Sequence, residues 1–438
     1  MNKKILIISY YFPPIKAIGG IRTYYFSKYL NINNWNVFIF TTSAYKILNK
    51  DSFLPKILNA KYIYIPTIDI QSLIVFFSYR KKNRKKKLFQ EKPNNKIGNT
   101  TLSQKIRNSL PFNISYEGGF IYIFFGVLMG LYNIKKNDIK YIYSTYSPNS
   151  NHIIAYILKL INPKLVWTAD FRDLPLGDSE TKIFFKKTQN YLNSKIYAKA
   201  NSLIVVSDGI KNKMLKYNSN IQVINNGFDN KVNDLTSRNL PKGQYFNIVY
   251  TGSLYGGKRD PELLFAVIKK LLSENKVTHD LRLIYAGKDG QVWDYLVNKY
   301  ELGRVSENLG LLSMKEVQKI QADASLFLMV TWSTNYETGV LTGKFFEYLQ
   351  YLKPIICLIN GNKDEEIEKK FISINCGSVI YKQDKNKLSN FIIENFNEWK
   401  LEKSINTKYN LNELESYTSE SLTKQLEKIL INKDYHNE

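Results

Sequence analysis

The hydrophobic positions of the chain form short continuous runs rich in Ile, Val, Leu, Tyr and Phe, separated by longer segments with helical spacing. Continuous runs are typical of strands buried on both faces, as in parallel sheets covered by helices. We expect strands at residues 5–9, 37–41, 62–65, 140–144, 164–168, 203–206 and 222–224, and again at 247–251, 282–286, 325–329, 354–358 and 378–381. Two successive series of alternating strands and helices predict an α/β protein with two doubly wound domains.

A polar stretch at residues 230–244 marks the boundary between the two domains. We predict a first domain at 1–235, a second domain at 236–417 and a final helix with its tail at 418–438. Ligands of open α/β sheets bind beyond the carboxyl ends of the strands. We therefore expect the ligand in a cleft between two facing domains.

The apolar segments are too short for membrane spans. The longest, residues 120–132, falls short of the about 20 residues that a spanning helix needs. Residues 5–9 are too few for the core of a signal peptide, and no small-residue cleavage site follows them. The chain has two cysteines, Cys357 and Cys376, which suit a reducing compartment. We expect a cytoplasmic protein without a transmembrane helix.

The formal charge is +24, from 62 basic and 38 acidic residues. Such a charge fits a phosphate-rich partner, and a biased genome composition explains it equally well. The run from Arg80 to Lys87 holds seven cations in eight residues and follows the apolar residues 73–77. This pattern suits an anionic membrane surface, and a solvated loop is an equal alternative. The run lacks interleaved aromatic residues, so we expect no nucleic-acid partner.

Candidate chemistry in the first half lies at the carboxyl ends of two strands. Gly19 and Gly20 precede a helical pattern, where glycines let the backbone approach a ligand and a helix N-terminus attracts anions. A plain strand-to-helix turn is the alternative. Asp170, Arg172 and Asp173 follow the strand at 164–168, where they either face a ligand or form a structural Asp–Arg pair.

A second glycine-rich loop opens the second domain. Gly252, Gly257 and Lys258 have the spacing of a phosphate-binding P-loop, but Arg259 stands where that motif needs a Ser or Thr to hold magnesium. The P-loop interpretation is therefore the less favoured one. The two cations nevertheless lie where a Rossmann-like domain binds phosphates.

The third candidate is a helix that we expect from Thr342, as its N-cap, to Tyr351. Lys344 and Glu347 are three residues apart and share a face of this helix. That face suits a diphosphate and the hydroxyls of a ribose, and a surface ion pair is an equal alternative. The sequence has three histidines without metal-ligand spacing and no Asp-x-Asp motif, so we expect no metal and no cofactor.

In this order and spacing, these segments resemble those of the family 4, retaining GT-B glycosyltransferases. The likeness runs nearly from end to end and is carried by Gly19-Gly20, residues 169–173, Val206-Ser207 with Gly209, residues 226–229, residues 250–253 and residues 342–349. The resemblance implies two Rossmann-like domains facing across a cleft, a last helix that crosses back to the first domain, and no requirement for a metal. It also implies front-face transfer of a sugar with retention.

Residue by residue, the resemblance is incomplete. Gly252, Leu254 and Lys258 match the motif that holds the donor diphosphate, but Ser253 replaces its arginine. We expect Lys344 to supply the missing positive charge.

Many family members carry two glutamates separated by seven residues. Glu347 matches the second glutamate, which the resemblance assigns to the ribose of the donor. Gly339 occupies the position of the first, and Glu337 is two residues out of register. This departure puts the usual contact of the first glutamate with the sugar in doubt.

The sequence thus predicts a hexosyltransferase-type glycosyltransferase that takes a UDP- or GDP-sugar to a glycan or lipid-linked acceptor in cell-surface polysaccharide assembly, on the inner face of the membrane. The expected catalytic residues are Asp170, Arg172, Asp173 and Lys258, and the expected donor-binding residues are Gly19, Gly20, Gly252, Ser253, Lys258, Arg259, Thr342, Gly343, Lys344 and Glu347. The alternatives are a polyanion-binding or nucleic-acid-binding protein, a nucleotide-sugar epimerase of the same fold, and a non-catalytic partner of this fold.

Overall fold

A computed structural model of the chain describes residues 3–15, 18–46, 54–69, 118–175, 186–237 and 243–432. The basic run from Arg80 to Lys87 lies outside these residues. The chain divides into two compact units, the first made of Met1–Asn225 with Ser419–Glu438 and the second of Asn226–Thr418. The boundary between Asn225 and Asn226 lies before the polar stretch at residues 230–244, in which we placed the domain boundary.

The first unit is built on a seven-stranded parallel sheet in the order β3-β2-β1-β4-β5-β6-β7. Its strands are β1 (Lys4–Ile8), β2 (Asn36–Thr42), β3 (Lys61–Ile65), β4 (Tyr141–Tyr146), β5 (Val166–Phe171), β6 (Ser202–Val205) and β7 (Ile221–Val223). The order reverses between β1 and β4, as in a doubly wound fold.

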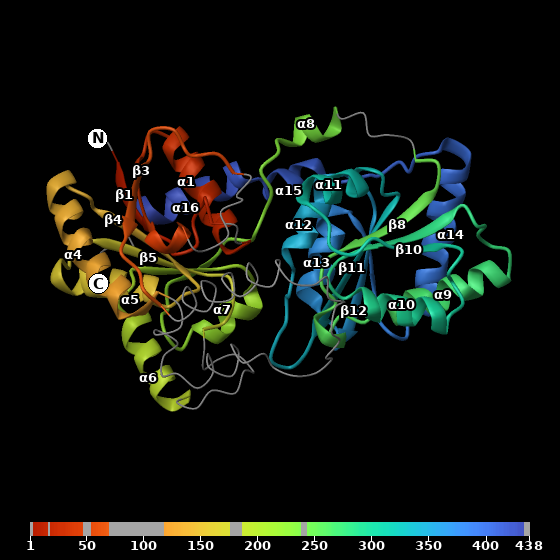
Figure 1. Ribbon diagram of the computed structural model, residues 1–438, viewed down its shortest axis with the longest axis horizontal. Helices are drawn as coiled ribbons and strands as arrows, with labels where there is room; N and C mark the ends of the chain where they lie inside the picture. The colour runs from red at the N-terminus through yellow and green to blue at the C-terminus, as the bar shows by residue number, and fades with distance from the viewer. Residues whose placement is uncertain are drawn as a thin grey trace, which may run out of the picture. The chain divides into compact units, whose positions relative to one another are not determined.

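Helices cover both faces of this sheet. They are η1 (Ile18–Gly20), α1 (Ile21–Ile32), η2 (Ser43–Lys46), α4 (Gly119–Asn137), α5 (Ser150–Ile161), α6 (Lys186–Tyr197), α7 (Asp208–Met214) and α16 (Ser419–Ile431). One core joins the sheet to α4, α5 and α6, and the other joins it to α1 and α16. Although it comes from the end of the chain, α16 lies beside α1 and buries Leu422 and Leu426 there (Figure 1). This confirms the prediction that the last helix returns to the first domain.

The second unit has a six-stranded parallel sheet in the order β10-β9-β8-β11-β12-β13. Its strands are β8 (Phe246–Thr251), β9 (Leu281–Ala286), β10 (Ser306–Asn308), β11 (Leu326–Ser333), β12 (Ile355–Gly361) and β13 (Gly377–Ile380). Each strand that the sequence predicts in either unit is present, whereas β10 was not predicted.

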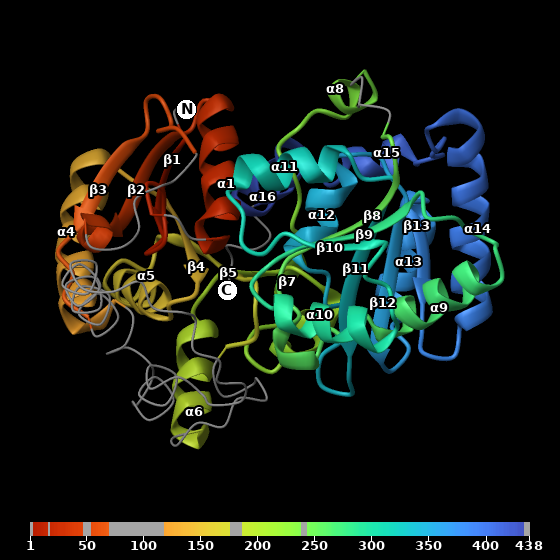
Figure 2. The same cartoon turned by 45° about the vertical axis from the view of Figure 1, so that its right-hand side comes forward.

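The helices of the second unit also form two layers, which Figure 2 shows around its sheet. They are α8 (Val232–Thr236), η4 (Tyr255–Gly257), α9 (Glu262–Ser273), α10 (Gly290–Lys299), α11 (Met314–Ala322), α12 (Gly343–Leu349), α13 (Glu365–Ile374), α14 (Lys385–Glu402) and α15 (Leu411–Glu415). The helices α9, α10 and α14 share one core with the sheet, and α12, α13 and α15 share the other. Each unit is therefore a Rossmann-like α/β sandwich.

Candidate active site

In the second unit, the predicted donor-binding residues lie at the carboxyl ends of neighbouring strands. The glycine-rich loop from Gly252 follows β8, Asp289 follows β9, and α12 follows β11. These three strands are adjacent in the sheet, and because all of them are parallel, their carboxyl ends share one edge. This is the edge at which open α/β sheets bind ligands.

Lys344 and Glu347 form an ion pair on α12, in which Lys344 Nζ lies 2.8 Å from Glu347 Oε2. About a quarter of each side chain is exposed, so the pair is within reach of a ligand. The second carboxylate oxygen, Oε1, accepts a hydrogen bond of 3.1 Å from Nε2 of Gln321. The same Nε2 donates to Thr251 Oγ1 at 2.9 Å, which ties the carboxylate to the end of β8. Gln321 is fully buried, and the sequence did not single it out.

The glycine-rich loop comes close to Lys344. Gly252 has φ +143°, and a Cβ added to it would lie 3.5 Å from Cε of Lys344. A larger residue would be strained at this φ, although its Cβ would make only an ordinary van der Waals contact with the lysine. The structure therefore brings together three of the predicted donor-binding residues, Gly252, Lys344 and Glu347.

Inside the loop, most of the backbone N–H groups already donate hydrogen bonds within the protein. Leu254 N donates to Asp289 Oδ2 at 2.7 Å, and Ser253 Oγ donates to the same oxygen at 2.6 Å. The N–H groups of Gly257, Lys258 and Arg259 donate to carbonyl groups of the same loop. A P-loop instead needs these groups free to surround a phosphate. The loop is therefore not a P-loop, in line with the sequence.

The two cations of the loop differ in their surroundings. Arg259 is 7% exposed, donates from Nη1 to the carbonyl of Ser253 at 3.1 Å, and lies over the rings of Tyr255 and Trp332. Lys258 is about half exposed and lies over the ring of Trp332. Lys258 is therefore the cation of this loop best placed to meet a ligand phosphate, whereas Arg259 mainly holds the loop together.

Gly339, which occupies the position of the first glutamate in the family that the sequence resembles, has a backbone conformation that disfavours a side chain. Its φ is +65°, its N–H donates to Asp364 Oδ2 at 2.8 Å, and a Cβ at this position would lie 2.1 Å from Glu366 Oε2. A glutamate here would adopt a left-handed conformation against another carboxylate. The carboxylate of Glu337 instead accepts from Trp332 Nε1 at 2.5 Å and lies 4.0 Å from Lys258 Nζ.

The helix that holds Lys344 is shorter than the sequence predicted. It runs from Gly343 to Leu349 and ends before Tyr351, with Thr342 as its N-cap residue. The Thr342 side chain makes no capping hydrogen bond, and a Cβ added to Gly343 would meet no atom within 4 Å. Both residues therefore adjoin the Lys344–Glu347 pair without taking part in it.

In the first unit, Asp170 is a buried structural anchor. Its carboxylate is unexposed and pairs with Arg22 of α1, with Nη2 and Oδ1 3.2 Å apart. It also accepts from the hydroxyls of Tyr143 at 2.7 Å and Thr145 at 3.3 Å. With these partners, the Asp170 carboxylate does not face a ligand, as its expected catalytic role would require. The Asp–Arg alternative is the one observed, but the arginine is Arg22 and not Arg172.

The other charged residues of this segment remain accessible. Arg172 donates from Nη2 to the carbonyl of Tyr146 at 3.0 Å, and Asp173 is exposed. A Cβ added to Gly19 would lie 3.1 Å from Nη2 of Arg172, and one added to Gly20 would lie 2.1 Å from a backbone carbonyl oxygen. Position 20 therefore has no room for a side chain, and Gly19 lies beside the Arg172 guanidinium. Among the described residues, no three His, Cys, Asp or Glu side chains are grouped to hold a metal ion.

No protein-family model and no curated protein matches the chain. Among solved structures, a glycosyltransferase from Rickettsia africae ESF-5 is 13% identical with a TM-score of 0.56, covering 100% of this chain and 99% of that one. The pneumococcal O-GlcNAc transferase GtfA, in complex with UDP and GlcNAc, is 10% identical with a TM-score of 0.57, covering 100% of both chains. The N-terminal domain of Candida albicans trehalose-6-phosphate phosphatase is 13% identical with a TM-score of 0.59, covering 100% of this chain and 98% of that one.

At these identities, the comparisons establish the fold, which is GT-B. A fold of this kind hosts several activities, so the activity of this chain depends on its own site residues.

Proposed function

We propose that the protein is a glycosyltransferase whose second unit binds the nucleotide diphosphate of a sugar donor. The observation that carries this proposal is the meeting of Gly252, Lys344 and Glu347 at the carboxyl edge of the sheet. The arrangement provides a cation for a diphosphate and a carboxylate for the ribose hydroxyls, side by side. Glycosyltransferases of the same fold, including one whose structure holds UDP, support the choice.

The departing diphosphate carries negative charge that the protein must stabilise as the glycosidic bond breaks. We assign this role to Lys344 and Lys258, so that the reaction needs no metal. Glu337, 4.0 Å from Lys258, is the carboxylate best placed to contact the donor sugar in place of a glutamate at position 339. Transfer with retention, by attack of the acceptor on the same face as the leaving diphosphate, is the mechanism that fits this assignment.

The acceptor side of the reaction belongs to the first unit. Arg172 and Asp173 are the accessible charged residues at the end of β5, and we propose that they contact a glycan or lipid-linked acceptor of surface-polysaccharide assembly. Asp170 has a structural role, since its carboxylate pairs with Arg22 and accepts hydrogen bonds from Tyr143 and Thr145.

Calorimetric titration of the full chain with UDP and GDP, with and without EDTA, tests the donor site. One nucleotide should bind irrespective of EDTA, and Glu347→Gln should weaken it by about 10- to 150-fold, the cost of about 1.5–3 kcal/mol for a hydrogen bond to a charged group. The matched control is Glu301→Gln, which changes an exposed carboxylate paired with Lys269 elsewhere in the second unit. Equal affinity in wild type and Glu347→Gln would remove the basis of the proposal, as would binding to DNA without any binding of nucleotides.

A further inference from the structure

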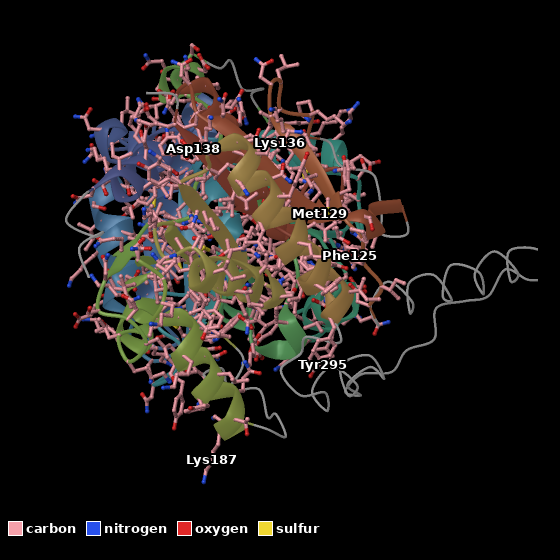
Figure 3. The ribbon with its side chains drawn as sticks, turned by 90° about the vertical axis from the view of Figure 1, so that its left-hand side faces the viewer. Phe125, Met129, Lys136, Asp138, Lys187 and Tyr295 are labelled. Atoms are coloured by element: carbon pink, nitrogen blue, oxygen red, sulfur yellow. The ribbon has the colours of Figure 1, made fainter. Side chains whose placement is uncertain are left out.

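The helix α4 carries an apolar face that no described element covers. Its exposed side chains fall on one side of the helix, at spacings of one, three and four residues. They are Phe120, Ile121, Phe124, Phe125, Leu128 and Tyr132. Phe120 is 71% and Phe124 59% exposed, although a phenylalanine is usually buried in a soluble domain. Figure 3 shows Phe125 and Met129 along this helix on one side of the first unit.

The opposite face of α4 fixes this orientation. Gly126 and Gly130 face α5, where a Cβ added to them would lie 2.5 Å from Cδ1 of Ile154 and 2.8 Å from Cδ1 of Leu158. The two glycines allow close packing of the helices, so α4 cannot rotate its aromatic residues into the core without a clash. The exposed face is therefore fixed by the packing of the first unit.

Basic residues flank the end of this face. Lys135 and Lys136 are exposed in the last turn of α4, and Lys140 follows the helix, with Asp138 as the one carboxylate between them. The helix itself contains no acidic residue. Lys136 Nζ also donates to Tyr132 Oη at 2.9 Å, which places a polar group at the border of the apolar face. A helix with an aromatic face, a tyrosine near one end and basic residues at that end is typical of proteins that lie in a membrane interface.

We propose that this α4 face, defined by the six exposed residues above, docks the protein on a lipid bilayer that contains anionic headgroups. Charge decides between a bilayer and a second copy of the chain. A second copy offers no acidic residue on the same helix to meet Lys135 and Lys136, and each copy carries a formal charge of +24. An anionic bilayer offers both an apolar layer and the opposite charge. No helix of the described residues is long and apolar enough to cross a membrane, so docking would be on the surface.

Vesicle sedimentation of the full chain measures this docking. Wild type should bind vesicles of phosphatidylcholine with phosphatidylglycerol and bind pure phosphatidylcholine less well. The double variant Phe124→Ser with Phe125→Ser should lose at least about tenfold in apparent affinity, because two apolar side chains no longer enter the interface. Lys135→Glu with Lys136→Glu should lose about tenfold on the anionic vesicles alone. The matched controls, Tyr295→Ser on α10 and Lys187→Glu on α6, also change exposed residues and should bind as wild type (Figure 3).

A fluorescent label separates docking by α4 from attachment by another basic part of the chain. Both cysteines of the chain are buried, so a cysteine introduced at Phe125 can be labelled selectively with an environment-sensitive dye. Its emission should shift to the blue on anionic vesicles, whereas a dye on Tyr295→Cys should not shift. An unchanged dye at position 125 on vesicle-bound protein would overturn the proposal. So would wild-type vesicle binding by the phenylalanine variant, or a dimer in solution that this variant abolishes while neither protein binds vesicles. Docking needs no nucleotide, so its failure would leave the proposed donor site untouched.

Discussion

Replacing Arg22 by methionine should destabilise the first unit strongly. The guanidinium donates to Asp170 from Nε at 3.2 Å and from Nη2 at 3.2 Å, and it also donates to the carbonyls of Asn225 at 2.6 Å and Ile224 at 2.9 Å. The pair is buried, with side-chain exposures of 7% for Arg22 and 0% for Asp170. The variant therefore leaves a buried carboxylate without its counter-ion and two carbonyl groups without their donor.

Breaking a buried ion pair on one side costs about 3–5 kcal/mol, because the remaining charge stays desolvated. Two hydroxyls still donate to the carboxylate of Asp170, so we expect a loss near the lower end of this range for Arg22→Met. Replacing both partners, as in Arg22→Met with Asp170→Leu, removes the stranded charge and should recover a large part of the loss.

Hydrogen–deuterium exchange, followed by mass spectrometry, is the suitable assay because it reports each unit separately in a chain that need not unfold in one step. Peptides from β4 and β5 should lose protection in Arg22→Met and regain it in the double variant, while peptides from β8 and β11 stay unchanged. A loss below about 1 kcal/mol in the single variant would refute the reasoning, since surface ion pairs reach that value. A double variant as unstable as the sum of the two single ones would also refute it.

Three further predictions concern single residues. Gln321→Leu should weaken binding of the nucleotide that the titration identifies about tenfold, because it removes the amide that positions the candidate ribose-binding carboxylate, whereas the exposed Gln318→Leu on the same helix should not. Burial lowers the pKa of His152 from 6.5 to about 3. As the pH falls, the histidine is therefore protonated in the unfolded chain before it is protonated in the folded one. The free energy of unfolding should consequently drop by about 2 kcal/mol between pH 6.5 and 5. Urea unfolding of His152→Phe should show a smaller drop, and an equal drop would exclude this histidine as the cause. Gly339→Ala should lower the free energy of unfolding by about 1–2 kcal/mol, because a φ of +65° is unfavourable for a residue with a side chain. The added Cβ would also approach Glu366. An unchanged melting temperature would contradict this prediction.

Much of the fold was predictable because both sheets are parallel and buried. Their strands are short apolar runs that helices cover on both faces, and this pattern is readable from sequence. The strand β10 escaped prediction because its three residues, Ser306–Asn308, are polar and lie at an edge of the sheet. The strand β11 was predicted too short, since Thr331, Trp332 and Ser333 continue its pairing with β12 beyond the apolar run.

The site was less predictable, because its contacts join residues that are distant in sequence. Gln321 lies 26 positions before Glu347, and Arg22 lies 148 positions before Asp170. For Asp170, the nearby Arg172 was the evident partner in the sequence, whereas the fold brings an arginine from α1 instead. In contrast, Lys344 and Glu347 are three residues apart on one helix, so helical spacing alone predicted their contact.

The missing first glutamate shows where comparison by sequence register stops being informative. Counting back from Glu347 places Gly339 at the position of the first glutamate and leaves Glu337 two residues out of register. In space, the turn at Gly339 is held by the carboxylate of Asp364, and the preceding residues place the Glu337 carboxylate 4.0 Å from Lys258. A sugar donor would meet a carboxylate beside that cation whichever residue number carries it, because binding depends on the position of charged atoms and not on their order in the chain. The departure at position 339 is therefore compatible with a working donor site, and it makes Glu337 the residue whose replacement should separate binding of a nucleotide-sugar from binding of the nucleotide alone.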